Sequence, residues 1–104
     1  MIIEQRDYHV YTGKLNELIE HYAQEGIEIQ KEVLGDLIGW FTTDMGELST
    51  VVSMWRYSNF ADREERRAAL KADPRWPGFM AKIQPLIHTQ RNRILIPTSF
   101  SPLQ

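Results

Sequence analysis

The sequence contains no cysteine, no long apolar run and no strong excess of charge of one sign. Without cysteine the chain can form no disulfide, thiolate nucleophile or cysteine-based metal site, which fits a reducing compartment. No segment approaches the roughly 18 apolar residues that a membrane span requires. Charged residues from Glu4 onward leave no apolar core of a signal peptide. These absences predict a cytoplasmic protein without a membrane span.

The balance of charges is that of an ordinary globular protein. Lys and Arg number 12 against 14 Asp and Glu, so the formal net charge is −2, and the sequence shows no electrostatic footprint for nucleic acid. The chain is 42% hydrophobic and 25% charged, without a repeat or an interdomain linker. Its length of 104 residues predicts a single domain over residues 1–104. Gly-rich phosphate loops and a Gly-x-Ser-x-Gly nucleophile motif are absent.

The first third of the chain predicts a strand followed by an interrupted helix. Residues 2–11 are rich in β-formers, and the Thr12 hydroxyl can cap a following helix. A core-facing stripe at helical spacing comes next: Leu15, Leu18, Ile19, Tyr22 and Ala23. We expect Gly26 to break or kink this helix. Gly35 is expected to end it, because glycine readily takes the left-handed conformation.

A hairpin and a charged helix follow. The runs 36–44 and 49–57 are rich in β-branched and aromatic residues and are joined by a short turn. Ser58 or Asn59 is expected to cap the next helix. The charges in residues 62–67 alternate in sign, with a pairing of Asp62 and Arg66 four residues apart, which predicts a solvated helix face.

The remainder predicts a second helical segment and a last strand. Asp73 and Pro74 are typical of a helix stop and restart. An amphipathic stripe then repeats at helical spacing: Trp76, Phe79, Met80 and Ile83. Residues 88–96 form the last predicted strand, before an extended tail. The order strand, helix, strand, strand, helix, strand predicts an α+β, ferredoxin-like βαββαβ fold, with a four-stranded antiparallel sheet and two helical segments on one face.

The predicted strands are apolar on both sides, although two helical segments can cover only one. In the third strand Val52 and Met54 alternate with Val51, Ser53, Trp55 and Tyr57. The second strand is expected to place Leu37 and Phe41 on one side, with Ile38 and Trp40 on the other. A water-facing antiparallel sheet would alternate apolar and polar residues. The open face would measure roughly 400 Å², a size typical of interaction sites. A homodimer packed sheet to sheet is therefore expected.

Three stretches together resemble the NIPSNAP family: RDYHVYTGKLNEL, LGDLIGWFTTDMGELSTVVSMWRYSNFADREERRAAL and RNRILIPTSFSPL. The resemblance covers nearly the whole chain in the family's order. It implies a ferredoxin-like dimeric α/β barrel, similar in architecture to small cofactor-free monooxygenases. It supplies no settled activity and no catalytic residues, so whether the chain is an enzyme stays open, and likeness of fold to the oxygenases carries no function by itself.

Six side chains are candidates for lining a ligand cavity between two subunits. If the face with Trp55 points into the dimer, residues of neighbouring strands join it, and the candidate set is Arg6, Tyr8, Trp40, Ser53, Trp55 and Tyr57. Apolar walls with a few convergent polar groups are typical of small-ligand pockets, and Arg6 could pair with a carboxylate of the ligand. The alternative is an interface core in which Glu4 neutralises Arg6.

The histidines offer a weaker candidate. The first and last strands of this fold are antiparallel neighbours, so His9 and His88 are expected near one another at one end of the sheet. Two imidazoles could bind a metal or shuttle a proton, but no carboxylate at motif spacing completes a metal site. Strand-end surface positions are the alternative for both, and His21 is expected on the solvated face of its helix.

Three functions are compatible with these features. The first is a homodimer that binds a small organic ligand, or binds and transforms it, without a tightly held cofactor. The second is a non-enzymatic scaffold in which the aromatic residues anchor an interface. The third, RNA binding, uses the same order of elements, but the aromatic-rich third strand lacks the required signature and the net charge has the wrong sign. We therefore expect no nucleic-acid partner.

Overall fold

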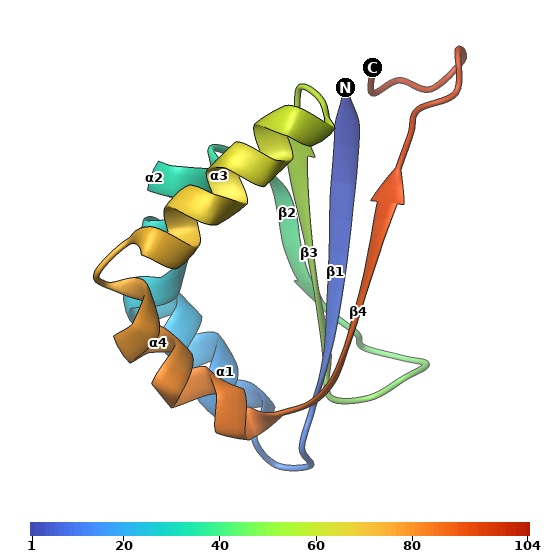
Figure 1. The fold of residues 1–104 in the computed structure, drawn as a ribbon. Helices are drawn as coiled ribbons and strands as arrows, with labels where there is room; N and C mark the ends of the chain where they lie inside the picture. Colours follow the sequence, from blue (N-terminus) through green and yellow to red (C-terminus); the bar gives the residue numbers. More distant parts are fainter.

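One four-stranded sheet is covered on one side by helices and left bare on the other (Figure 1). The computed structural model describes all residues, 1–104. Its elements are β1 (Ile2–Val10), α1 (Leu15–His21), a π-helical turn (Tyr22–Gly26), α2 (Ile27–Leu34), β2 (Asp36–Thr42), β3 (Thr50–Tyr57), α3 (Phe60–Ala72), α4 (Trp76–Ile83), a 3₁₀ turn (Gln84–Leu86) and β4 (Ile87–Leu95).

The sheet has the strand order β2-β3-β1-β4 with every pair antiparallel. This confirms the α+β, ferredoxin-like arrangement expected from the order of elements. β1 lies between β3 and β4, so its side chains are flanked on both sides. None of the helices combines the length and the apolar character that crossing a bilayer demands.

The expected break at Gly26 is absent, although a π-helical turn that ends at Gly26 interrupts the α-helical pattern of the first helical region. This region runs from α1 through the π-helical turn into α2, and Gly26 has helical angles of φ −64° and ψ −41°. Gly26 is buried against the ring of Phe79, and an added Cβ would lie 2.6 Å from Phe79 Cε1. A glycine is therefore needed at position 26 because the Phe79 ring of α4 packs directly against its backbone. Gly35 does end α2, with φ +89°, as expected.

The predicted helix caps are only partly correct. Asn59 caps α3, since its side-chain oxygen accepts a hydrogen bond from the Asp62 amide at 2.8 Å. Thr12 caps nothing, because the chain turns once more and α1 begins only at Leu15. Asp73 organises the turn between α3 and α4, where its carboxylate accepts from the Arg75 amide at 2.9 Å. Pro77, and not Pro74, lies in the first turn of α4.

The core lies between the sheet and the helices and has two parts. One part packs β1 and β3 against α1 and α4: Tyr8, Val10, Leu18, Tyr22, Val51, Phe79, Ile83 and Leu86. The other packs the opposite end of the sheet against α2 and α3: Ile2, Ile29, Leu34, Trp55, Tyr57 and Leu70. A register shift in β2 places Leu37 against this second part, beside Trp55. The expectation that Leu37 and Phe41 share a face is wrong, because such an irregularity changes the alternation.

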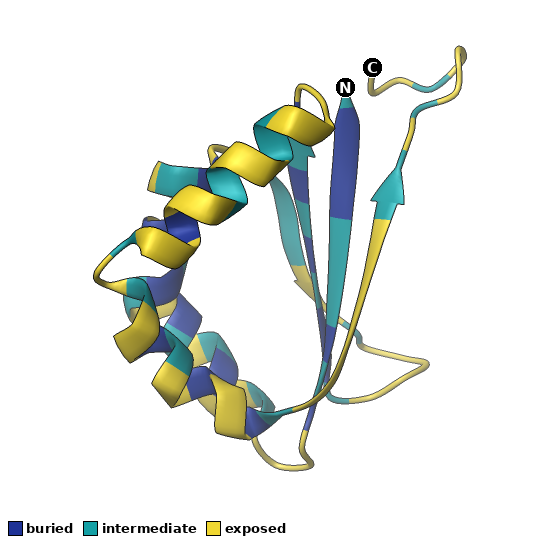
Figure 2. Cartoon of the chain, viewed as in Figure 1, coloured by how far each residue is buried: buried dark blue, intermediate teal, exposed yellow.

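The helices leave both the far face of the sheet and the inner side of β4 uncovered (Figure 2). On the far face Val52, Met54 and Leu95 are half-buried, and Phe41 is 52% exposed. Along β4 most residues are exposed on both faces. The space between the sheet and the helices is therefore open toward β4.

Candidate functional site

The six candidate side chains share one face of the sheet, and that face is the one beneath the helices. Trp55 and Tyr57 belong to the core formed with α2 and α3, while Tyr8 and Trp40 pack with α1 and α4. Arg6 lies between these two groups and pairs in register with Ser53. The expectation that this face meets a partner subunit is wrong. Alternation along a strand groups side chains by face, but it does not show which face the helices cover.

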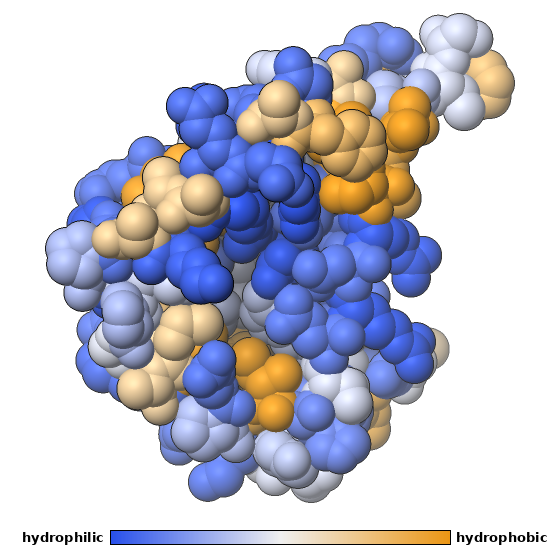
Figure 3. Space-filling view, viewed as in Figure 1, coloured by the Kyte–Doolittle hydropathy of each residue, from blue (hydrophilic) through white to orange (hydrophobic).

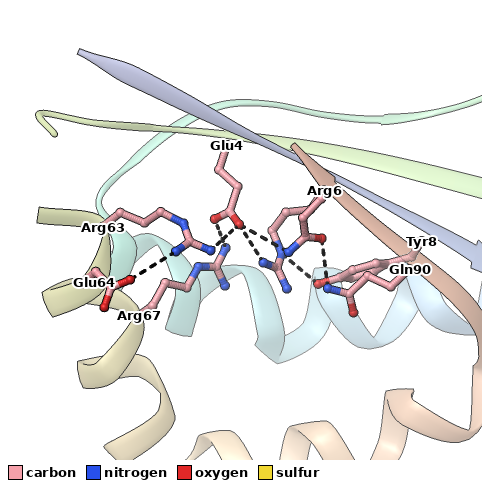
Figure 4. Close-up of polar contacts among 8 residues, drawn as sticks. Glu4, Arg6, Tyr8, Arg63, Glu64, Arg67 and Gln90 are labelled. Carbon is pink, nitrogen blue, oxygen red and sulfur yellow. Dashed lines mark hydrogen bonds and ion pairs between the residues drawn. The ribbon is translucent and has the colours of Figure 1, made fainter. Parts of the chain in front are cut away.

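Glu4 lies at the centre of this covered face and organises three arginines (Figure 4). Its side chain is 0% exposed. Glu4 Oε2 lies 3.0 Å from Arg6 Nη1 and 2.8 Å from Arg63 Nη2, and Glu4 Oε1 lies 3.2 Å from Arg67 Nη2. The expected pairing of Arg6 with Glu4 is therefore confirmed. We call Glu4, Arg6, Arg63 and Arg67 the Glu4 cluster.

Two members of the Glu4 cluster come from the charged helix that was expected to face solvent. Arg63 and Arg67 lie one turn apart on α3, so both point toward the sheet. They are only 25% and 18% exposed, whereas Glu64 between them is 79% exposed. The expected pairing of Asp62 with Arg66 is confirmed at 2.8 Å. The signal that could have revealed this is their helical spacing: Arg63, Arg67 and the buried Leu70 follow at i, i+4 and i+7, which places them on the inner side of α3.

The charges of the cluster do not cancel. Burial alone would raise the pKa of Glu4, but the hydrogen bond from Arg63 and the charges of Arg67 and Arg6 lower that pKa below its ordinary value. Burial alone would lower the pKa of Arg6, but Tyr8 and Glu4 raise it. Glu4 is therefore ionised at neutral pH and faces three guanidinium groups. One carboxylate among three cations leaves an excess of positive charge inside the protein.

Several buried polar atoms have no partner within the protein: Gln30 Oε1, Trp55 Nε1, Tyr57 Oη, Arg63 Nε and Arg67 Nε. Glu4 Oε1 and Arg67 Nη2 meet only each other, at 3.2 Å, and Arg56 Nε lies on the other face of the sheet, 3.4 Å from Asp36 Oδ2. Buried polar groups in native proteins normally have partners, and most of these atoms lie on or beside one covered patch. Burial raises the pKa of Tyr57, and Arg67 opposes that shift, so the Tyr57 hydroxyl is protonated at neutral pH. Donors outnumber acceptors in this set, which suits an anion.

The Glu4 cluster can be reached from the β4 side. On the inner side of β4, Gln90 and Asn92 are exposed and lie opposite Tyr8 and Arg6 in register. The Asn92 amide is within hydrogen-bonding distance of both Glu4 and Arg6. Figure 3 shows a crevice between the helices and β4 whose walls are mostly hydrophilic. We call this crevice the charged cleft.

Within the charged cleft, Arg6 also orders Tyr8. Arg6 Nε donates a hydrogen bond to the Tyr8 hydroxyl oxygen at 3.1 Å, and its guanidinium lies 5.7 Å from the centre of the Tyr8 ring. Burial beside Tyr8 raises the pKa of Tyr22 well above its ordinary value. Hydrogen bonds and ion pairs thus run from Tyr8 through Arg6 and Glu4 to the two arginines of α3.

His9 and His88 are neighbours at one end of the sheet, as expected. Their ring centres are 5.8 Å apart, and Tyr11 packs edge-on against His88 at 4.9 Å. His9 Nδ1 also lies 3.6 Å from Glu47 Oε1. No group of three His, Cys, Asp or Glu side chains lies close enough together to hold a metal ion. The contacts of the two histidines are therefore with each other, with an aromatic ring and with a carboxylate, as at a strand-end surface position.

Comparison with known proteins identifies the family. The family model for NIPSNAP matches residues 3–102. The chain belongs to the NIPSNAP family. A solved NIPSNAP family protein of unknown function from Agrobacterium tumefaciens is 43% identical, with a TM-score of 0.97 over 100% of this chain and 94% of that one. An uncharacterised NIPSNAP domain protein from Burkholderia xenovorans is 35% identical, with a TM-score of 0.94 over 98% and 99% of the two chains.

Longer NIPSNAP proteins contain a similar region. Protein NipSnap homolog 1 of Danio rerio is 34% identical over 103 residues, which are 99% of this chain and 36% of the relative. Protein NipSnap homolog 2 of Homo sapiens is 30% identical, over 99% and 35% of the two chains. The chain thus spans little more than a third of the length of these curated relatives.

The NIPSNAP fold is also shared with more distant proteins. A protein described as an antibiotic biosynthesis monooxygenase, from Nitrosomonas europaea, is 12% identical and has a TM-score of 0.68 over 93% of this chain and 98% of that one. Such a likeness shows a common ferredoxin-like fold. A common fold does not transfer an activity.

Proposed function

We propose that this NIPSNAP chain binds a small organic anion in the charged cleft. The observation that carries the proposal is the composition of the Glu4 cluster, in which one buried carboxylate faces three guanidinium groups. The cleft opens to solvent along β4, so a ligand can reach these groups. Guanidinium groups bind carboxylates and phosphates through paired, charge-assisted hydrogen bonds.

Of the six residues expected to line a cavity, Arg6 and Tyr8 keep that role in the proposal, at a different place in the molecule, with side chains that are 13% and 7% exposed. Trp55 and Tyr57 are 0% and 1% exposed and would support the cleft from behind. Ser53 lies beside Arg6 in register, and Trp40 lines a separate apolar groove. The ligand would therefore lie within one subunit, between its sheet and its helices, and not between two subunits. The proposal covers binding and assigns no reaction.

Arg67 is the residue whose loss tests the proposal most directly. Arg6 and Arg63 both contact Glu4 Oε2, whereas Arg67 faces Glu4 Oε1 and keeps Nε free of hydrogen bonds. Arg67→Met should weaken anion binding at least tenfold, because a charge-assisted hydrogen bond contributes about 1.5–3 kcal/mol. Isothermal titration of the purified chain with octanoate, benzoate, succinate and inorganic phosphate measures the effect.

The matched control is Arg66→Met on the same helix. Arg66 pairs with Asp62 outside the Glu4 cluster, so this variant should bind anions as the unchanged chain does. Equal affinities in the two variants, or no binding of any anion by the unchanged chain, would contradict the proposed function. Native mass spectrometry adds an independent measurement, since a retained ligand raises the mass of the folded protein by a discrete amount.

We also propose that the chain forms a homodimer through the open face of the sheet. The apolar residues on that face belong to all four strands: Ile3, Phe41, Val52, Met54 and Leu95. Arg91 and Arg93 of β4 lie beside Asp7 and Gln5 of β1 on the same face. Apolar and charged groups of both signs make such a surface complementary to a second copy of itself.

Met54→Glu should convert the dimer into a monomer, because a charge at the centre of an apolar interface would be buried without a partner. Native mass spectrometry and light scattering measure the assembly. Ala69→Glu on the exposed side of α3 is the control and should leave the dimer intact. An unchanged chain that is monomeric at micromolar concentration would refute the assembly. The cytoplasmic location expected from the sequence stays a prediction.

A further inference from the structure

We propose that the anion carries an apolar body, as a medium-chain or aromatic carboxylic acid does, and that this body lies in a hollow between α3 and α4. The inference rests on the proposed function and extends it to a class of ligand. The hollow has a volume of about 480 Å³, within the range of small-molecule sites. Its lining residues are Arg67, Leu70, Lys71, Trp76, Pro77, Met80 and Gln84.

The charge at one end of the hollow is of a single sign. Arg67 and Lys71 lie one turn apart on α3, and no acidic residue belongs to the lining. Arg67 belongs both to the hollow and to the Glu4 cluster, where its Nη2 lies 3.2 Å from Glu4 Oε1. A carboxylate at Arg67 would therefore lie at the junction of the charged cleft and the hollow. Lys71 would add a second positive charge beside it.

The other end of the hollow is apolar. Leu70 of α3 faces Trp76, Pro77 and Met80 of α4 across it. Trp76 packs against both parts of the core and Met80 against one, so these walls are held in place from behind. Methionine and tryptophan are suited to flat or aliphatic ligands, because both offer large polarisable surfaces. An aliphatic chain or an aromatic ring fits this wall better than water does.

Two other hollows differ from this one in their lining. The groove lined by Ile19, Tyr22, Ala23, Ile27 and Trp40 is wholly apolar and has a volume of about 170 Å³. The pocket beside Met1, of about 160 Å³, pairs Arg56 and Arg66 with two aspartates and so has no excess of positive charge. Of these three hollows, the one between α3 and α4 combines cations, an apolar wall and a lining without any acidic residue. This combination indicates an amphipathic anion.

A series of straight-chain carboxylates tests the inference. Isothermal titration of the full chain with butyrate, hexanoate, octanoate and decanoate should show affinity rising about three- to fourfold per added methylene group until the hollow is full. Octanol, which has a comparable chain without the charge, should bind at least tenfold more weakly than octanoate. Succinate and phosphate should bind more weakly than octanoate.

The possible outcomes separate the inference from the proposed function. If succinate or phosphate binds as tightly as octanoate and affinity does not rise with chain length, the inference is overturned while anion binding stands. If octanol binds as tightly as octanoate, the carboxylate has no role at Arg67 and the inference is overturned. If no anion binds at all, the proposed function itself fails, and the inference fails with it.

Variants of the apolar wall provide a second measurement. Met80→Gln keeps the size of the side chain but makes the wall polar, and should lower octanoate affinity at least fivefold with butyrate affinity unchanged. Met45→Gln, at an 84% exposed loop position, is the matched control. Gln84→Leu, at an exposed position of the lining, extends the wall and should raise octanoate affinity. A Gln84→Leu variant with octanoate affinity unchanged or lowered would count against the inference even if Met80→Gln fails to fold.

Discussion

Glu4→Gln should lower the free energy of unfolding by about 3 kcal/mol at neutral pH, because it removes the single anion from a buried group of charges. The substitution preserves the size of the side chain and one oxygen that can still accept a hydrogen bond. It leaves Arg6 and Arg67 without a counter-ion and Arg63 with only the exposed Glu64 at 3.9 Å, although the three arginine side chains are just 13%, 18% and 25% exposed. Urea unfolding followed by circular dichroism measures the loss.

The effect of Glu4→Gln should depend on pH in a defined direction. The arginines lower the pKa of Glu4 in the folded chain, below the value of about 4.3 of an unfolded glutamate. The stabilisation is therefore complete above the unfolded-state pKa and disappears as the pH falls through the lowered folded-state pKa. The difference between the variant and the unchanged chain should be constant above about pH 5 and should shrink in acid.

Glu64→Gln is the matched control for this prediction. Glu64 neighbours Arg63 on α3 and lies 3.9 Å from its Nη1, but it is 79% exposed. Exposed ion pairs contribute little, so this variant should change the free energy of unfolding by less than about 0.5 kcal/mol. Equal losses in the two variants, or a Glu4→Gln effect that grows toward acid pH, would show that burial of Glu4 does not organise the arginines.

Gly26→Ala should also destabilise the chain, by about 2 kcal/mol, although alanine is the better helix former. Gly26 has helical backbone angles, so strain in φ is not the reason. A Cβ at this position would overlap the ring of Phe79, which is 1% exposed and packs edge-on against Tyr22 with ring centres 4.9 Å apart. Phe79 cannot move aside without disturbing that stacking.

Gly78→Ala is the matched control, in the helix that carries Phe79. Nothing lies within 4 Å of a Cβ added at Gly78, so only the gain in helix propensity remains. This variant should be stabilised by up to about 1 kcal/mol. Thermal unfolding should therefore place the two alanine variants on opposite sides of the unchanged chain, separated by more than about 10 °C. Stabilisation of both variants would mean that Gly26 does not hold α4 in place.

The sequence was sufficient to predict the order and pairing of the strands. Alternation in β1 and β3 correctly grouped Arg6 and Tyr8 with Trp55 and Tyr57, because side chains on a strand point to opposite faces in turn. The same rule failed in β2, where the register shift places Leu37 beside Trp55. A bulge adds one residue to one strand only, and its one sign in this stretch is Gly39 beside the shift, since a glycine inside a strand often marks a bulge.

Only the strand residues of the candidate site could be predicted from the sequence. The strand residues were found, but Arg63 and Arg67 were assigned to a solvated face, because alternating charges on a helix usually face water. Their role depends on Glu4, which is 59 residues away from Arg63 in the chain. A buried carboxylate reverses the usual preference of helix charges for solvent, since the arginine side chains are stabilised more by pairing with it than by contact with water.

By itself the sequence determined the order of elements, the helix end at Gly35, a helix cap at Ser58 or Asn59, and the grouping of side chains by face in β1 and β3. These properties depend on neighbours within a few residues, through periodicity and backbone preferences. Only the tertiary structure decided which face the helices cover and which arginines meet Glu4. Both depend on how helices separated in the chain pack against the sheet, and the energy of burying a charge is set by whatever lies opposite it in space.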